Sequence, residues 1–182
     1  QEKPNPLLTR RARSNKGAEL NFRSADFSRA TMLGGDMSAE RPSILGLGGT
    51  TDPGSSTEQA LRLALAAAEA QGAEVTIFGA ETLAALPHYS AGAVARSPEA
   101  QRLVAAFRAA DGLILASPGY HGSISGLVKN AIDYAEETSK DERVYFDDVP
   151  VGLIVTAYGW QATGSTLATL RSIVHALRGW PT

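Results

Sequence analysis

The sequence predicts an α/β protein in which helices cover both faces of a doubly wound parallel β-sheet. The first observation is an alternation of short apolar runs with amphipathic helical segments from residue 43 onward. The second is the length of 182 residues, which suits one globular domain with an appended segment. The third is the composition, 43% hydrophobic and 20% charged, which excludes collagen-like and wholly disordered chains.

The first half of the pattern supplies two strands and two helices. Residues 43–49 form a short apolar run that ends in glycine, as expected of a buried strand. Residues 56–71 are rich in Ala and Leu and are followed by Gly72, a helix stop. The next strand is expected at 74–78, followed by a long polar connection. A helix is then expected at 97–110, with a serine cap and a proline in its first turn.

The second half repeats the alternation twice. Apolar strands are expected at residues 112–116 and 151–156, each followed by a helix, at 125–137 and 166–177. Strands that alternate with helices pair in parallel, so their carboxyl ends meet at one edge of the sheet. Ligands bind beyond that edge, near the point where the strand order reverses.

Charge divides the chain into two parts. Residues 1–42 hold eight Lys or Arg and five acids, whereas residues 43–182 hold nine bases and fourteen acids. Residues 1–42 show no apolar periodicity, so we expect a basic extension that is irregular or flexible. It can be read as an organelle transit peptide, an expression remnant, or an arm that orders on a neighbouring subunit; its acids weaken the transit-peptide reading. It lacks the apolar run of a secretory signal, and a cytoplasmic location is expected.

Composition narrows the chemistry. The formal net charge of −2 gives no support for binding to nucleic acid or to an anionic membrane. The chain has no cysteine, which excludes disulfides, thiolate nucleophiles, iron–sulfur clusters and cysteine-based zinc sites. His88, His121 and His175 are scattered along the chain, so no metal site is expected. The chemistry must come from oxygen ligands, backbone groups or a borrowed cofactor.

The loop after the first expected strand, residues 49–57, resembles a phosphate loop but has Ser55 where that motif requires lysine. A nucleoside triphosphate with magnesium is therefore not expected. The hydroxyls of Thr51, Ser55, Ser56 and Thr57 stand before a helix N-terminus, where donors and the helix dipole favour one phosphate monoester. An equally weighted reading is that these residues only cap the helix.

Two further loops follow strands at the same edge. Residues 117–126 place Tyr120 and His121 between glycines, and residues 158–164 are again aromatic and glycine-rich. A lone Tyr-His pair is more often surface decoration, but its position between a strand end and a helix start favours a site. Together the three loops offer a phosphate site and two aromatic walls, as a flat heteroaromatic ring with a phosphate tail requires.

Residues 43–182 resemble the NAD(P)H-dependent FMN reductase family of flavodoxin-like flavoproteins. The most specific segment is Ser-Pro-x-Tyr-His-Gly-Ser-x-Ser-Gly-Leu-x-Lys-Asn at 117–130, supported by Tyr-Gly-Trp-Gln-x-Thr-Gly at 158–164. The resemblance implies sheet order 2-1-3-4-5 and an FMN-binding domain at 43–182. The cofactor-binding residues that it implies are Thr50, Ser55, Ser56 and Thr57 at the phosphate; Ser117, Pro118, Gly119, Tyr120, His121 and Gly122 along the ring; and Tyr158, Gly159 and Gln161 at its other side.

Three departures from the family pattern stand out. The first loop has Asp52 where the family often has arginine, and Gly119 stands where an acidic residue is common. The chain stops at Thr182, just after the fourth helix, whereas the family continues with a fifth strand and a last helix. We therefore expect the fifth strand to be absent. Either the sequence is incomplete, or residues 1–42 or a partner subunit cover the open edge.

The resemblance implies an enzyme that transfers hydride from NADPH or NADH to FMN and on to an acceptor such as free flavin, passed to a flavin-dependent monooxygenase, or a quinone. No side chain need act as acid or base, because the flavin carries the chemistry. Tyr120, Tyr158 and Trp160 are candidate walls for the nicotinamide. The alternatives are a non-enzymatic FMN-binding electron carrier and an interaction module whose loops only cap helices.

The resemblance also implies a homodimer or homotetramer. The expected third helix carries Asp133, Glu136 and Glu137 beside Tyr134, which gives an amphipathic face with an exposed aromatic. Such a face suits a helix-mediated interface near the FMN site, and an ordinary solvated face is the alternative.

Overall fold

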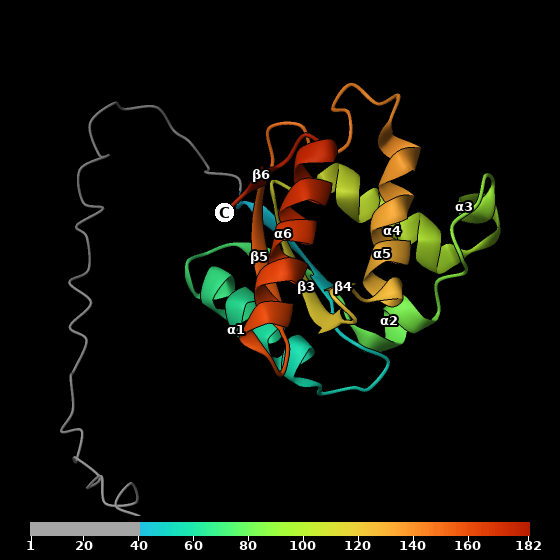
Figure 1. The fold of residues 1–182 in the computed structure, drawn as a ribbon. Helices are drawn as coiled ribbons and strands as arrows, with labels where there is room; N and C mark the ends of the chain where they lie inside the picture. Colours follow the sequence, from blue (N-terminus) through green and yellow to red (C-terminus); the bar gives the residue numbers. More distant parts are fainter. Residues whose placement is uncertain (1–40) are drawn as a thin grey trace, which may run out of the picture. The chain divides into compact units, whose positions relative to one another are not determined.

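The computed structural model describes residues 41–182. The expectation of a basic extension at 1–42 therefore lies outside the described residues, apart from its last two positions. A parallel sheet runs through the centre of the described part, between helices (Figure 1). In residues 41–182 no helix is both long and apolar enough to cross a lipid bilayer.

The sheet has the order β2-β1-β3-β5-β6, and all four of these neighbouring pairs are parallel. Its strands are β1 (Ser43–Gly48), β2 (Glu74–Phe78), β3 (Gly112–Tyr120), β5 (Pro150–Thr156) and β6 (Trp180–Pro181). A further short strand, β4 (Ser123–Ile124), pairs antiparallel with the end of β3. Numbered without β4, this order is the predicted 2-1-3-4-5, so the predicted fold class is confirmed.

Helices connect the strands as predicted, with two short additions in the long connection after β2. The helices are α1 (Ser56–Ala70), α2 (Ala80–Ala84), α3 (Ala93–Arg96), α4 (Pro98–Ala109), α5 (Gly126–Asp133), the 3-10 helix η1 (Tyr134–Thr138) and α6 (Trp160–Ala176). Serine side chains cap three of them: Ser55 on α1, Ser97 on α4 and Ser125 on α5. Gly72, just after α1, has φ +96, the left-handed conformation that ends helices.

Two apolar cores lie on the two faces of the sheet. The larger core joins the sheet to α4, α5 and α6, with Leu47, Phe107 and Leu170 among its fully buried members. The smaller core lies under α1, where Leu61 and Leu65 pack on Ala116. Figure 1 shows α1 on one side of the sheet and α4 and α5 on the other. This two-sided cover leaves the carboxyl ends of the strands as one open edge.

The long connection between β2 and α4 is fixed to α5 at its middle. The Pro87 carbonyl accepts hydrogen bonds from Asn130 Nδ2 at 3.0 Å and from the Tyr134 hydroxyl at 2.9 Å. Asn130 Oδ1 accepts from the Tyr89 amide at 2.9 Å. Burial raises the pKa of Tyr134, whose ring is fully buried edge-on to Tyr89. The expected exposed aromatic on the third helix is therefore wrong, because this connection covers it.

Two further expectations require correction. The fifth strand was expected to be absent, but Trp180–Pro181 forms a two-residue parallel strand on β5. Its hydrogen bonds run from the Trp180 amide to Val149 O and from the Thr182 amide to Val151 O, both at 2.9 Å. The helix expected at 166–177 begins six residues earlier, at Trp160, so the third loop shortens to 157–159.

Candidate functional site

A cavity of about 440 Å³ lies at the carboxyl ends of β1, β3 and β5. Three chain segments line it: the β1–α1 loop with the first turn of α1, the end of β3, and the end of β5. The lining residues are Thr50, Asp52, Ser55, Ser56, Thr57, Pro118, Gly119, Tyr120, Thr156, Ala157 and Tyr158. The structure thus brings residues from all three predicted loops to one cavity.

The N-terminus of α1 provides hydrogen-bond donors at one end of this cavity. Ser55 caps the helix, since its Oγ accepts from the Glu58 amide at 3.4 Å. Among residues 41–182, no hydrogen bond uses the amides of Ser56 and Thr57. Free amides in the first turn carry the partial positive charge of the helix dipole. This end of the cavity therefore suits an anion.

Thr50 has a different local role. Its hydroxyl accepts from the Asp52 amide at 3.0 Å and lies 3.3 Å from the Asp52 carbonyl, to which it donates. These contacts fold the turn and place the exposed Asp52 in the cavity lining. Thr51, which the sequence also singled out for its hydroxyl, is exposed and is not among the lining residues. Among residues 41–182, Asp52 is the only one in the lining that carries a carboxylate.

Thr57 connects α1 to the end of β5. It is 2% exposed, and its Oγ1 lies 2.6 Å from Oγ1 of Thr156, the last residue of β5. The two hydroxyls stand side by side in the cavity wall. Thr156 and its neighbour Ala157 were missed at the level of sequence. The available signal was the position of Thr156 as the last residue of a predicted strand, where chemistry is expected in parallel sheets.

The predicted second loop is largely a β-hairpin. Residues 117–120 continue β3, and His121 and Gly122 form the two-residue turn to β4 with φ of 50 and 88. Positive φ at both positions is typical of a type I′ turn. Pro118, Gly119 and Tyr120 line the cavity, whereas His121 and Gly122 lie beyond its lining at the exposed tip.

Ser117 stabilises this hairpin from inside. The side chain is fully buried; its hydroxyl accepts from the Ser125 amide at 3.0 Å and donates to the Pro118 carbonyl at 2.9 Å. It is not among the lining residues of the cavity. The structure therefore gives Ser117 a bracing contact at the base of the hairpin.

Gly119 packs closely against α6 and the residue after β5. A Cβ atom at this position would stand 2.9 Å from Thr166 Oγ1 and 3.2 Å from the Ala157 Cβ. Contacts under 3.0 Å require a neighbour to move, so a larger residue would displace α6 or the hairpin. This close approach explains a glycine in place of the acidic residue that the sequence comparison led us to expect.

Three exposed aromatic side chains lie in the cavity lining or close to it in the sequence. Tyr158 and Trp160 are almost fully exposed, at 114% and 91%, and Tyr120 is 51% exposed. Tyr158 and Tyr120 line the cavity, but Trp160 does not. Gly159 caps α6, and Gln161 is exposed in its first turn; neither is a lining residue. The third predicted loop thus contributes one lining residue from the predicted set.

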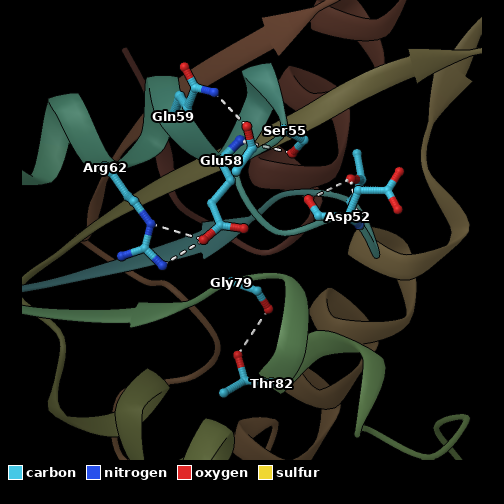
Figure 2. A network of polar contacts seen from close by, with 9 residues as sticks. Asp52, Ser55, Glu58, Gln59, Arg62, Gly79 and Thr82 are labelled. Carbon is cyan, nitrogen blue, oxygen red and sulfur yellow. Dashed lines mark hydrogen bonds and ion pairs between the residues drawn. The ribbon is translucent and has the colours of Figure 1, made fainter.

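Glu58 is a buried acidic residue next to this site, and no feature of the sequence predicted a role for it. Its spacing from Ser55 is that of a capping box, in which the glutamate would turn back to the cap. Figure 2 shows instead that the carboxylate points toward Arg62 and Gly79 and away from Ser55. Oε1 accepts from Arg62 Nε at 2.9 Å, and Oε2 is buried without a hydrogen-bond partner among the described residues.

Comparisons with known proteins identify the family and the fold of the chain. The sequence model of the family described as NADPH-dependent FMN reductase matches residues 42–182. A curated FMN-dependent NADPH-azoreductase of Staphylococcus aureus is 45% identical over 71 residues, which cover 39% of this chain and 34% of that protein. The chain thus spans about a third of the length of the curated relatives it matches.

Solved structures resemble the chain over most of its length. FerB from Paracoccus denitrificans, a flavoenzyme NAD(P)H:(acceptor) oxidoreductase, aligns with TM-score 0.63 and 21% identity over 78% of this chain and 75% of that chain. An azoreductase from Bacillus anthracis aligns with TM-score 0.57 and 16% identity over 77% of this chain and 85% of that chain. A WrbA-like flavodoxin from Agrobacterium tumefaciens aligns with TM-score 0.51 and 20% identity over 76% and 75%. These likenesses confirm the flavodoxin-like fold.

Proposed function

The chain belongs to the NADPH-dependent FMN reductase family, and on that premise we propose that it binds FMN in the cavity at the carboxyl ends of β1, β3 and β5. We propose that it uses FMN to oxidise NAD(P)H and to reduce a second acceptor. The observation that carries the proposal is the pair of amides of Ser56 and Thr57, which make no hydrogen bond within residues 41–182 and lie beside hydroxyls at the start of α1. A phosphate monoester is the ligand that such a helix start favours.

The cavity fits FMN in size and in the order of its chemistry. Its volume of about 440 Å³ lies within the range of cofactor sites. Hydroxyls and amides line the end formed by α1, and backbone with aromatic rings lines the end formed by β3 and the segment after β5. We propose that Thr50, Ser55, Ser56 and Thr57 hold the phosphate, and that Pro118, Gly119, Tyr120 and Tyr158 contact the ring.

The remaining predicted residues do not line the cavity, and we propose different roles for them. We propose that Ser117 acts by bracing the hairpin, because its hydroxyl is already used by two backbone groups. We propose that His121, Gly122, Gly159 and Gln161, which lie outside the lining, border the edge of the bound ring. This role requires the bound ring to extend past the cavity lining.

FMN, when bound, accepts the hydride of NAD(P)H and passes electrons on, so the chain itself need not supply an acid or a base. The protein binds the phosphate, orients the ring against the backbone of Pro118 and Gly119, and leaves one side open. Tyr120 and Tyr158, which are exposed and line the cavity, offer flat surfaces for a nicotinamide or an aromatic acceptor, and we propose that exposed Trp160, two residues after Tyr158, adds a third. We propose free flavin, a quinone or an azo compound as the acceptor.

A self-associating surface is also proposed. A groove of about 340 Å³ lies between α5, η1 and α6, and Ile132, Ile173 and Leu177 contribute its apolar lining. Such a groove suits a helix-mediated homodimer, in agreement with the predicted homodimer or homotetramer. Sedimentation velocity of the chain, with and without FMN, measures this directly; a monomer at micromolar concentration under both conditions contradicts it.

The function is tested by following NADPH and NADH oxidation at 340 nm with and without added FMN, while the flavin absorbance band reports binding. We expect oxidation that depends on FMN. Flavin binding without oxidation would favour the electron-carrier alternative. A chain that binds no flavin contradicts the proposed site.

Two buried threonines provide a matched pair of variants. Thr57 and Thr138 are each 2% exposed, but Thr138 lies in η1 and donates to Ala135 O at 2.8 Å, far along the chain from the cavity lining. Replacement by valine removes one hydroxyl in each case at constant shape. We expect Thr57→Val to weaken FMN binding about tenfold and Thr138→Val to leave it unchanged.

A further inference from the structure

The hydroxyl pair formed by Thr57 and Thr156 joins two elements that are distant in the sequence. The residues are 99 positions apart, and their Oγ1 atoms lie 2.6 Å from each other. Thr57 is the second residue of α1, and Thr156 is the last residue of β5. Both hydroxyls lie in the wall of the cavity proposed to hold FMN.

A pair of hydroxyls has one proton more than its mutual hydrogen bond uses. Each threonine hydroxyl donates once and accepts up to twice. Either oxygen can be the donor in the observed contact, so one proton stays available for a third group. The contact therefore decides which of the two hydroxyls presents a donor to the cavity.

The position of Thr57 makes its hydroxyl dependent on this contact. A threonine deeper in a helix donates to the carbonyl four residues earlier, as Thr169 does to Ser165 O at 3.1 Å. Thr57 stands in the first turn and makes no such bond; within residues 41–182 its hydroxyl has Thr156 as its partner. The free amide of Thr57 lies at the same helix start, so an anion there meets both groups.

We propose that Thr156 is a positioning residue for phosphate recognition: its hydroxyl donates to Thr57 Oγ1 and so directs the Thr57 proton toward the phosphate of FMN. This inference rests on the proposed function and adds to it a residue outside the implied FMN set. A phosphate oxygen only accepts hydrogen bonds, so the donor has to be turned toward it. Thr156 supplies that orientation from the sheet.

The assignment makes a prediction about ligand choice that a purely structural role does not. If Thr156 acts through the phosphate, it affects FMN binding and leaves riboflavin binding unchanged, because riboflavin has the same ring but no phosphate. If Thr156 only holds β5 against α1, its loss disturbs the whole cavity, and both flavins bind less tightly.

The experiment measures FMN and riboflavin affinity by flavin fluorescence for the 182-residue chain and its variants. Thr156→Val is expected to weaken FMN binding about tenfold and to change riboflavin binding by less than about twofold. Thr156→Ser keeps the hydroxyl and should restore FMN binding. Thr82→Val is the control, since Thr82 is also half-buried but donates to Gly79 O outside this cavity.

A double-mutant cycle tests whether Thr156 acts through Thr57. We expect Thr57→Val to cost at least as much FMN affinity as Thr156→Val, and Thr156→Val to cost nothing further in the Thr57→Val background. Additive losses, or a larger loss at Thr156, overturn the assignment of Thr156 as the positioning residue. Circular dichroism and thermal unfolding of each variant confirm that the fold is kept.

The outcomes separate this inference from the function on which it rests. The role of Thr156 is overturned if the wild-type chain binds FMN and Thr156→Val binds it with the same affinity, or if Thr156→Val loses equal affinity for FMN and riboflavin. Either result leaves the proposed function in place. A wild-type chain that binds neither flavin overturns both.

Discussion

Two helix ends of this molecule differ in whether the protein itself supplies partners for their backbone groups. At the C-terminus of α4, the guanidinium of Arg143 donates at 2.8 Å to each of the Phe107, Arg108 and Ala110 carbonyls. At the N-terminus of α1, the Ser56 and Thr57 amides find no acceptor among the described residues. The chain completes one helix end itself and leaves the other open to a cavity.

This difference distinguishes residues that contribute to stability from residues that contribute to ligand binding. Helix ends expose four unpaired backbone groups, and each must find a partner in the protein, in water or in a ligand. Arg143 fits three carbonyls because its donors are fixed in one plane, and its positive charge matches the negative end of the helix dipole. The α1 end keeps its positive partial charge for a negative partner. Substitutions at the two ends should therefore change different measurements.

The largest effect is expected from Arg143→Ala. Three carbonyls lose a charged partner at once, and we expect the free energy of unfolding to fall by about 2 kcal/mol, which lowers Tm by about 6 °C. FMN affinity should not change, because Arg143 is remote from the cavity lining. Urea unfolding and a flavin titration measure the two quantities, and Arg171→Ala, at an exposed arginine on α6, is the control. A loss of FMN affinity at constant stability would break the comparison.

Helix caps offer a matched pair with a smaller effect. Ser55 caps α1 beside the cavity, and Ser97 caps α4 away from it, accepting from the Ala100 amide at 3.2 Å. Replacement of either by alanine should lower the free energy of unfolding by about 1 kcal/mol. Only Ser55→Ala should also weaken FMN binding, because its hydroxyl lines the cavity. Equal FMN affinity in the two variants would show that the Ser55 hydroxyl is only a cap.

Asp52 tests whether charge at the open end of α1 affects ligand binding. Its carboxylate is the one acidic group that the described part of the chain contributes to the cavity lining, where an anionic phosphate is proposed to bind. Asp52 is exposed, so we expect Asp52→Asn to strengthen FMN binding by about 0.5 kcal/mol, roughly twofold, through the loss of repulsion in water. Riboflavin affinity should stay constant, and the gain should shrink at high salt. Asp147→Asn, at an exposed aspartate after η1, serves as the control.

The smallest effect is expected in the pH dependence of stability, through an ion pair near the C-terminus of α4. The hydrogen bond from Arg108 lowers the pKa of Asp141, with Nε and Oδ2 separated by 2.7 Å. A carboxyl whose pKa is lowered by folding stabilises the protein above its unfolded pKa of about 3.9, and this stabilisation disappears as the pH falls through the folded pKa. We expect unfolding free energy to decline below about pH 4, and less steeply in Asp141→Asn. Urea unfolding between pH 3 and 7 measures this.

FMN binding should follow a different pH range. The second ionisation of a phosphate monoester lies near pH 6, so affinity at the α1 end should fall as the pH drops through about 6, while stability is still constant. Coincident pH profiles for FMN affinity and for unfolding would contradict the separation of the two helix ends.

Local signals were sufficient to predict most elements of the fold. Apolar runs located β1, β2 and β5 to within a residue, and the Ser97 cap followed by proline located the start of α4, because both signals depend on neighbouring residues. The start of α6 was misplaced, since Gly164 and two aromatics resemble a loop. A Cβ at Gly164 would meet open space, so this glycine lies on an outer face and does not break the helix.

Long-range contacts account for the remaining errors. Trp180–Pro181 has too few residues for a strand signal, and it is a strand only because β5 lies beside it. Tyr134 is buried because a connection distant in sequence crosses it. The three site loops were predicted because they follow strand ends. Thr156 is itself the last residue of a strand and Ala157 follows it directly, so neither was included in the predicted loops. The assignment of individual residues to FMN remains a prediction.

The attachment of Pro87 to α5 has a consequence for how this fold can vary between relatives. One carbonyl held by Asn130 and Tyr134 divides the connection between β2 and α4 into two independent arms. The entropy of closing a loop grows slowly with its length, so each arm tolerates insertions separately as long as the attachment is kept. The exposed residues 90–92, between this attachment and α3, are therefore a suitable position for an added segment, whether by evolution or by protein engineering, without displacement of the sheet.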